Sequence, residues 1–244
     1  GDSYVAVSWE QATRIVADEI SRVRGASGNG AIYAGSYGWA SAGRFHHAQS
    51  QLRRFLNMAG GYVSSRNTYS FAAAEVLLPY VTGMSMREFE DTSTSWPLVA
   101  EHCELLVAFG GISSRTAQVT SSGTAKHEVE SWLAKLKARL VNVSPLKSDM
   151  ADSEWISLRP NTDTAMILAL CHTLLEAGLH DEAFLQRYTS GWETFRDYLQ
   201  GSDGIVKDAD WAATICDVPA KRIRDLAHAM ASHKTMISMA WGLQ

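Results

Sequence analysis

One apolar segment restricts this chain to an α/β fold more than any other feature of its sequence. Leu105–Phe109 is fully apolar, has the length of a strand and ends at Gly110-Gly111. A helical pattern over 124–138 follows, and Leu140-Val141-Asn142-Val143 is the next expected strand. A strand, a helix and a second strand in this order form a βαβ unit. Such a unit requires a parallel sheet and places ligands at the carboxyl ends of its strands.

The segments on either side of this unit continue the alternation of helices and strands. A capping box, Ser8 with Gln11, begins a helix in which apolar residues recur at helical spacing. We expect further helices over 41–59, from Ser70 toward Gly83, from Asp163 to Ala177 and within 181–233, and further strands over 31–35, 156–158 and 236–240. The sequence therefore predicts a three-layer α/β fold, a Rossmann-like parallel sheet with flanking helices.

The strongest candidate for a domain boundary is the polar stretch 84–96, which has an irregular pattern. Within it, Glu88-Phe89-Glu90-Asp91 has the composition of an acidic loop. This boundary divides the 244 residues into 1–83 and 84–244. The chain ends directly after the last expected strand, where an α/β domain normally continues into a helix. We therefore expect a fragment of a larger multidomain protein.

Composition excludes several classes of partner. The net charge is -4, and no stripe of Lys and Arg with interleaved aromatic residues is present, so nucleic acid is not an expected partner. No run approaches eighteen apolar residues, so no membrane-spanning helix is expected. The three cysteines are far apart and have no metal-binding spacing. A removed leader would leave no trace in this sequence, so the compartment, periplasmic or cytoplasmic, stays open.

Two turns in the first part of the chain carry the candidate catalytic residues. Tyr37 and Trp39 lie in a turn that follows the expected strand 31–35, and Ser70 begins the next helical pattern. Turns of this kind can bring the three side chains together at one end of an α/β layer. Spacing alone favours a helix cap for Ser70. Its oxygen could instead ligate a metal as an alkoxide, with the tyrosine and tryptophan as hydrogen-bond donors.

Three further segments follow strands of the expected parallel sheet. They are Ile112-Ser113, Ser144-Pro145 and Asn161-Thr162-Asp163. The glycines before the first segment do not form GxGxxG, and no acidic residue ends the next strand, which argues against an ordinary NAD site. The last segment is first of all a helix N-cap, although the same polar end could hold a base or a phosphate.

Ordered motifs along the whole chain resemble one family. They are Val5–Ala12, Gly35-Ser36-Tyr37-Gly38-Trp39, Leu56–Gly61, Tyr69-Ser70, Thr94–Pro97, Arg159–Asp163, His180–Leu185 and Ala240–Gln244. The chain is similar to the molybdenum oxotransferases of the dimethyl sulfoxide reductase family, in particular to its biotin sulfoxide and trimethylamine N-oxide reductase branch. The resemblance implies that 1–83 and 84–244 both lie in one molybdopterin oxidoreductase domain. The first part would carry the metal serine, and the second would be a Rossmann-like cofactor-binding part.

The resemblance also implies the roles of individual residues. Ser70 would ligate molybdenum through its side-chain oxygen, Trp39 would hydrogen-bond the oxo ligand, and Tyr37 would assist removal of the substrate oxygen. The cofactor would be molybdenum with two molybdopterin guanine dinucleotides and no iron–sulfur cluster in this segment. Its expected contacts are Tyr37, Gly38, Trp39, Ala40, Ser41, Ser70, Ile112, Ser113, Ser144, Pro145, Asn161, Thr162, Asp163, Trp241 and Gly242. The partners would be a small S-oxide or N-oxide substrate and an electron donor, either a c-type cytochrome or a reductant protein.

This chain departs from the family's usual motifs at three of these positions. Phe71-Ala72 replaces Thr-Gly after the metal serine, Ile112-Ser113 replaces Asn-Pro, and Ser144 replaces the Asp of Asp-Pro, so a hydroxyl would have to replace a carboxylate. The family's catalytic chains are also much longer. The expected function is reduction of S-oxides or N-oxides by oxygen-atom transfer. The alternatives are a non-catalytic α/β nucleotide-binding module and an excised fragment that is inert by itself.

Overall fold

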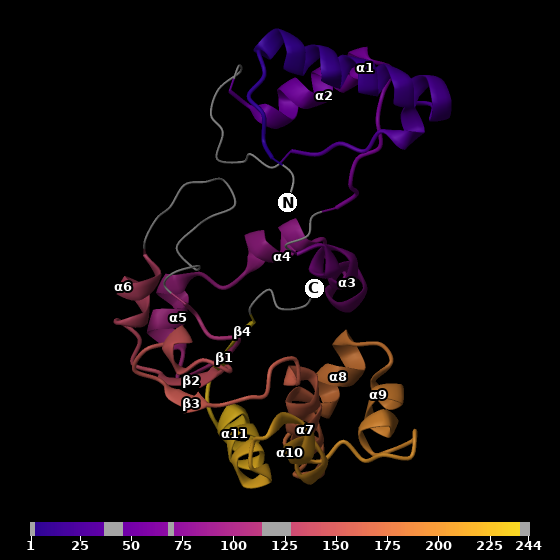
Figure 1. Ribbon diagram of the computed structural model, residues 1–244. Coiled ribbons are helices and arrows are strands. Elements are labelled where there is room, and N and C mark those ends of the chain that lie inside the picture. Colours follow the sequence, from indigo (N-terminus) through magenta and orange to yellow (C-terminus); the bar gives the residue numbers. More distant parts are fainter. Residues whose placement is uncertain (1–2, 37–45, 68–70, 114–127, 240–244) are drawn as a thin grey trace. The chain divides into compact units, whose positions relative to one another are not determined.

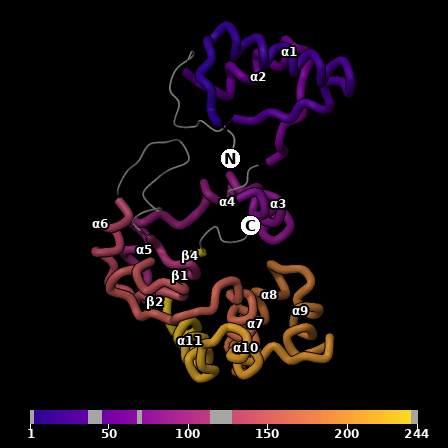
Figure 2. Tube along the Cα trace, viewed as in Figure 1, coloured from indigo at the N-terminus to yellow at the C-terminus, as the bar shows by residue number. Residues whose placement is uncertain are grey.

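The computed structural model describes residues 3–36, 46–67, 71–113 and 128–239 (Figure 1). The chain divides into two compact units, Gly1–Tyr69 and Ser70–Gln244, and Figure 2 traces the backbone of both. The division at 83/84 expected from the sequence stays a prediction. Among the described residues, no helix has the length and apolar content needed to cross a membrane.

The first unit contains helix α1 (Trp9–Ser27), the 3-10 turn η1 (Asn29–Ala31) and helix α2 (Ala48–Met58). Ser8 accepts a hydrogen bond from the backbone N–H of Gln11 at 3.2 Å, as the capping pattern predicts. Helix α2 ends before Gly60 and Gly61, whose positive φ values allow the chain to leave the helix. The expected helical residues 41–45 lie outside the described part of the chain.

The strand expected over 31–35 is not formed as a strand. Its first residue belongs to η1, and only Tyr33 makes a parallel bridge, to Val63. Backbone hydrogen bonds from Ala34 N to Val63 O (2.9 Å) and from Val63 N to Ile32 O (2.8 Å) hold this bridge. The segment has the apolar composition of a strand, but one bridge is too short to count as a ladder.

The second unit begins with three helices: α3 (Ala72–Thr82), α4 (Met86–Thr92) and α5 (Trp96–His102). The first confirms the helix expected to end at Gly83, which adopts a left-handed conformation. Helix α4 overturns the expectation of an irregular stretch with an acidic loop at 88–91. Ser85 and Glu88 form a capping box, because the Ser85 hydroxyl accepts from Glu88 N and the Glu88 carboxylate accepts from Ser85 N.

Four parallel strands form the sheet, in the order β3-β2-β1-β4. They are β1 (Leu105–Phe109), β2 (Arg139–Val143), β3 (Glu154–Ile156) and β4 (Thr235–Met239). The structure confirms the strands expected at 105–109 and 140–143. Strand β3 lies two residues earlier than expected, and β4 begins one residue earlier than the predicted strand. Two strands are therefore placed correctly from the sequence, and the other two with small shifts.

Helices cover both faces of the sheet, so the predicted three layers are present. On one face, α7 (Asp163–Glu176), α10 (Ala209–Cys216) and α11 (Ala220–Ser232) pack against Leu105, Val107 and Phe109 of β1. On the other face, Leu106 and Ala108 pack with residues of α5 and α6 (Val129–Leu133). Alternate residues of β1 thus enter opposite cores. Helices α8 (Glu182–Tyr188) and α9 (Trp192–Leu199) complete the unit, with α9 in contact with α7.

The turn after β1 depends on a close approach that only glycine allows. Gly111 has a φ of +71°, and a Cβ atom there would lie 2.5 Å from the Cβ of Asp149 and 3.1 Å from its carbonyl oxygen. The next residue, Ile112, donates its N–H to the same carbonyl oxygen at 3.0 Å. This contact joins the loop after β1 to the loop after β2 at the carboxyl edge of the sheet.

Gly111→Ala is expected to lower the free energy of unfolding by about 2–5 kcal/mol, because positive φ and overpacking both oppose the new methyl group. Gly178→Ala is the matched control. Gly178 has a φ of +62°, and a methyl group added there would meet nothing within 4 Å, so only the backbone cost of about 1–2 kcal/mol should appear. Equilibrium urea unfolding followed by circular dichroism measures both variants. Equal losses in the two variants would contradict the importance of the close approach.

Candidate functional site

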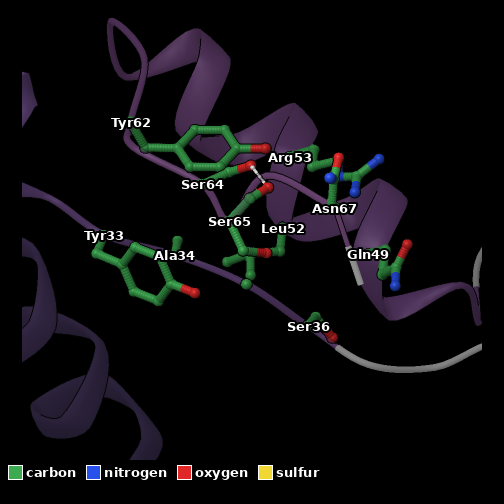
Figure 3. Close-up of a pocket in the computed structure, with 11 residues that line it drawn as sticks. Tyr33, Ala34, Ser36, Gln49, Leu52, Arg53, Tyr62, Ser64, Ser65 and Asn67 are labelled. Atoms are coloured by element: carbon green, nitrogen blue, oxygen red, sulfur yellow. Dashed lines mark hydrogen bonds between the residues drawn. The ribbon is translucent and has the colours of Figure 1, made fainter. Parts of the chain in front are cut away.

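A pocket of about 460 Å³ opens in the first unit, between segments that directly precede the two candidate turns in the sequence (Figure 3). Three pieces of chain form its walls: the segment 33–36, one side of α2 and the segment 62–67. Ser36, which directly precedes Tyr37, and Asn67, which lies three residues before Ser70, both line it. The other lining residues are Tyr33, Ala34, Gly35, Gln49, Leu52, Arg53, Tyr62, Ser64 and Ser65.

The parallel bridge between Tyr33 and Val63 explains why these two segments meet in one pocket. Paired parallel segments run in the same direction, so the residues that follow each of them emerge at the same edge. Helix α2 forms the connection between them, which makes this part of the unit a small version of a βαβ arrangement. Ser36 and Asn67 follow the bridge by three and four residues, and they therefore reach the same end.

Several predicted site residues lie outside the described part of the chain. They are Tyr37, Gly38, Trp39, Ala40, Ser41, Ser70, Trp241 and Gly242. Among the described residues, no group of three or more His, Cys, Asp or Glu side chains could hold a metal ion.

The remaining predicted contacts lie at the carboxyl edge of the sheet in the second unit. Ile112 and Ser113 follow β1 and are half-buried. Ser144 and Pro145 follow β2, and the first of these is only 1% exposed. The two loops are joined by the bond from Ile112 N to Asp149 O. The sequence thus predicted correctly that these segments share one edge.

The Ser144 hydroxyl is already fully engaged inside the protein. It donates to Asp149 Oδ2 at 2.5 Å and accepts from Leu146 N at 3.2 Å. The Ser144 carbonyl oxygen accepts from Trp155 Nε1 at 2.8 Å. The half-buried carboxylate of Asp149 is therefore hydrogen-bonded to the residue at whose position the resemblance expects an acidic group. Sequence reasoning missed Asp149, although it is the one acidic residue of the loop 144–150.

The segment Asn161-Thr162-Asp163 lies between β3 and α7. Thr162 occupies the N-cap position as predicted, but its hydroxyl donates back to Arg159 O at 2.6 Å and caps no N–H of the helix. Asn161 is exposed with a φ of 62°. The first turn of α7 consequently offers backbone N–H groups at the carboxyl edge without a side-chain cap.

A family model described as molybdopterin oxidoreductase matches residues 1–244. The chain belongs to the molybdopterin oxidoreductase family. Biotin sulfoxide reductase of Cereibacter sphaeroides is 43% identical to it, covering 100% of this chain and 34% of that protein. Trimethylamine-N-oxide reductase of Haemophilus influenzae is 38% identical, covering 100% of this chain and 30% of the relative. The resemblance stated from the motifs is thereby confirmed.

A third relative is also a reductase of S-oxides and N-oxides by its name. Dimethyl sulfoxide/trimethylamine N-oxide reductase of Cereibacter sphaeroides is 38% identical, with 99% of this chain and 30% of that protein covered. The chain spans about a third of the length of these curated family members. Acetylene hydratase from Pelobacter acetylenicus has a TM-score of 0.54 and 19% identity over 98% of this chain and 30% of that chain. That likeness confirms the α/β fold.

Ser144→Ala is expected to lower the free energy of unfolding by about 1–3 kcal/mol, because it leaves Leu146 N unpaired and removes a hydrogen bond to a carboxylate. Ser157→Ala is the control at the neighbouring strand end. Ser157 is exposed, and its hydroxyl forms no hydrogen bond within the described part of the chain, so its variant should stay within about 0.5 kcal/mol of wild type. Thermal and urea unfolding compare the two variants. Indistinguishable stabilities would show that the Ser144 hydroxyl does not hold this loop.

Proposed function

We propose that this chain is part of the catalytic polypeptide of a molybdenum-dependent reductase that removes the oxygen atom from S-oxides or N-oxides. Relatives 38–43% identical over essentially the whole chain carry such activities in their names. The observation in the structure that carries the proposal is the shared pocket of Ser36 and Asn67. In the sequence, Ser36 directly precedes Tyr37, and Asn67 lies three residues before Ser70.

Membership in the family implies molybdenum bound to molybdopterin. The carboxyl edge of the sheet fits such a group on two observations. The first turn of α7 has no side-chain cap, which leaves donors for a polar or anionic group. The buried Oδ1 of Asn142, beneath the loops after β1 and β2, has no hydrogen-bond donor among the described residues. The N–H groups of α7 and the Oδ1 of Asn142 can therefore form hydrogen bonds with a ligand that carries both acceptors and donors.

The finer form of the cofactor is also part of the proposal. We infer two guanine dinucleotide forms of molybdopterin, with no iron–sulfur cluster in this segment. The residues that would hold the cofactor are those expected from the sequence. One dinucleotide would bind at the edge formed by Ile112, Ser113, Pro145 and Asn161–Asp163. The buried Ser144 would contribute by positioning Asp149, because its own hydroxyl is already engaged.

When bound, molybdenum supplies two-electron oxygen-atom transfer. We propose that residues of this chain hold the metal and polarise the substrate oxygen. Ser70 would ligate the metal through its oxygen, while the Tyr37 hydroxyl and the Trp39 indole N–H would donate hydrogen bonds to the substrate oxygen. Negative charge grows on that oxygen as its bond to sulfur or nitrogen weakens, so donors fixed in advance lower the barrier. A c-type cytochrome or a reductant protein would supply the electrons.

In the full-length protein, Ser70→Ala is expected to lower turnover of S-oxides by more than about a hundredfold, the size of effect seen when a group that contacts the reacting atoms is removed. Ser21→Ala, at an exposed position of α1, is the control and should retain wild-type turnover. The assay is reduction of dimethyl sulfoxide, biotin sulfoxide and trimethylamine N-oxide by dithionite-reduced viologen dye.

Elemental analysis of the same preparations completes this test. About one molybdenum per wild-type chain supports the enzyme, whereas its absence supports the alternative of a non-catalytic nucleotide-binding module. Wild-type turnover with a full complement of molybdenum in Ser70→Ala would refute the proposed ligand.

A further inference from the structure

Arg53 places a positive charge in the pocket of the first unit. It is the one charged side chain among the described lining residues, and no carboxylate is among them. Within the described part of the chain, Arg53 makes no ion pair and no hydrogen bond. Two other arginines of this unit are paired, Arg14 with Glu10 and Arg22 with Glu19. Arg24, Arg54 and Arg66 share with Arg53 the lack of an ion pair within the described part of the chain, but they do not line the pocket. Arg53 is therefore the one cation among the described lining residues, and its exposed side chain is accessible to a ligand from solvent.

Helical spacing explains why Arg53 faces the pocket. Gln49, Leu52 and Arg53 stand at positions i, i+3 and i+4 of α2, which share one face of a helix. Arg54 is one position further, about 100° around the helix axis, and does not line the pocket. Figure 3 shows Arg53 on the α2 wall, with Tyr62 and Asn67 on the facing segment. Hydroxyl and amide side chains therefore line the same pocket as the cation.

This arrangement suits a carboxylate better than a pyrophosphate. A guanidinium presents parallel N–H groups that match two oxygens of a carboxylate or of a phosphate, so the choice between the two ligands depends on the other groups around Arg53. A pyrophosphate is usually held by a helix N-terminus or a series of backbone N–H groups, whereas Arg53 projects from the side of α2. The volume of about 460 Å³ is in the range of small-molecule sites.

We propose that Arg53 binds the carboxylate of an S-oxide substrate and so makes the enzyme prefer anionic S-oxides to neutral ones. This inference rests on the proposed function and adds the substrate class and a specificity-determining residue. A carboxylate at Arg53 leaves the rest of the molecule to extend along the pocket toward Ser36 and Asn67, which lead into the segments of the proposed catalytic residues.

Equilibrium binding to the full-length, cofactor-loaded protein tests the inference without reductant, so that no turnover occurs. Biotin sulfoxide and its methyl ester are the two probes, because they differ in the charge of the carboxyl group. Wild type should bind the acid at least about tenfold more tightly than the ester, the contribution expected of a charge-assisted hydrogen-bonded pair. Arg53→Gln should reduce this ratio to less than about twofold, and Arg53→Lys should give an intermediate ratio.

Arg54→Gln is the matched control and should retain the wild-type ratio, since Arg54 is exposed on the same helix but lies outside the pocket. No preference in wild type, or an unchanged preference in Arg53→Gln, would overturn the inference. A fall in molybdenum content in Arg53→Gln would also overturn it, by assigning Arg53 to the cofactor. Absence of S-oxide turnover in wild type would refute the proposed function instead, while the affinity ratio would still decide the role of Arg53.

Discussion

Strand β1 pairs in parallel with β2 on one side and with β4 on the other. This pairing positions the helical layers and the loops at the carboxyl edge of the sheet in the second unit. The five residues of β1 are 0–6% exposed and alternate between the two cores that hold the helical layers. Parallel neighbours cannot be joined by a tight turn, so each connection must cross a face of the sheet. As a result the loops after β1, β2 and β3 meet at one edge, and Asp149 ties the first two of them together.

The same geometric rule acts on a smaller scale in the first unit. A single parallel bridge, Tyr33 with Val63, brings together two segments that are distant in the sequence, 33–36 and 62–67. The pocket between them combines a lone cation with hydroxyl and amide groups. A site formed in this way draws its polar groups from one side of a helix and from the residues that follow an isolated bridge, and it needs no continuous sequence motif.

Much of the architecture could be predicted because a run of apolar residues indicates a buried strand. The segments 105–109 and 140–143 correspond to β1 and β2, since strands covered on both faces are mainly apolar. Asn142 of β2 is a buried polar exception. Helix α4 was missed because its acidic composition outweighed the short capping signal of Ser85 with Glu88. The strand at 31–35 was overpredicted for the opposite reason, because apolar composition cannot tell a ladder from a single bridge. The family was predicted from ordered motifs, and the comparisons confirm it.

The sequence by itself determined the fold class, the parallel sheet, the loops that share its edge and the family to which the chain belongs. Tertiary structure decided which polar groups at those positions remain available. The Ser144 hydroxyl is engaged by Asp149, the Thr162 hydroxyl bonds Arg159, and Arg53 rather than Arg54 lines the pocket. The reason is physical. Apolar patterning records burial one residue at a time, whereas a hydrogen bond or a free charge depends on which groups folding brings within about 3 Å of each other.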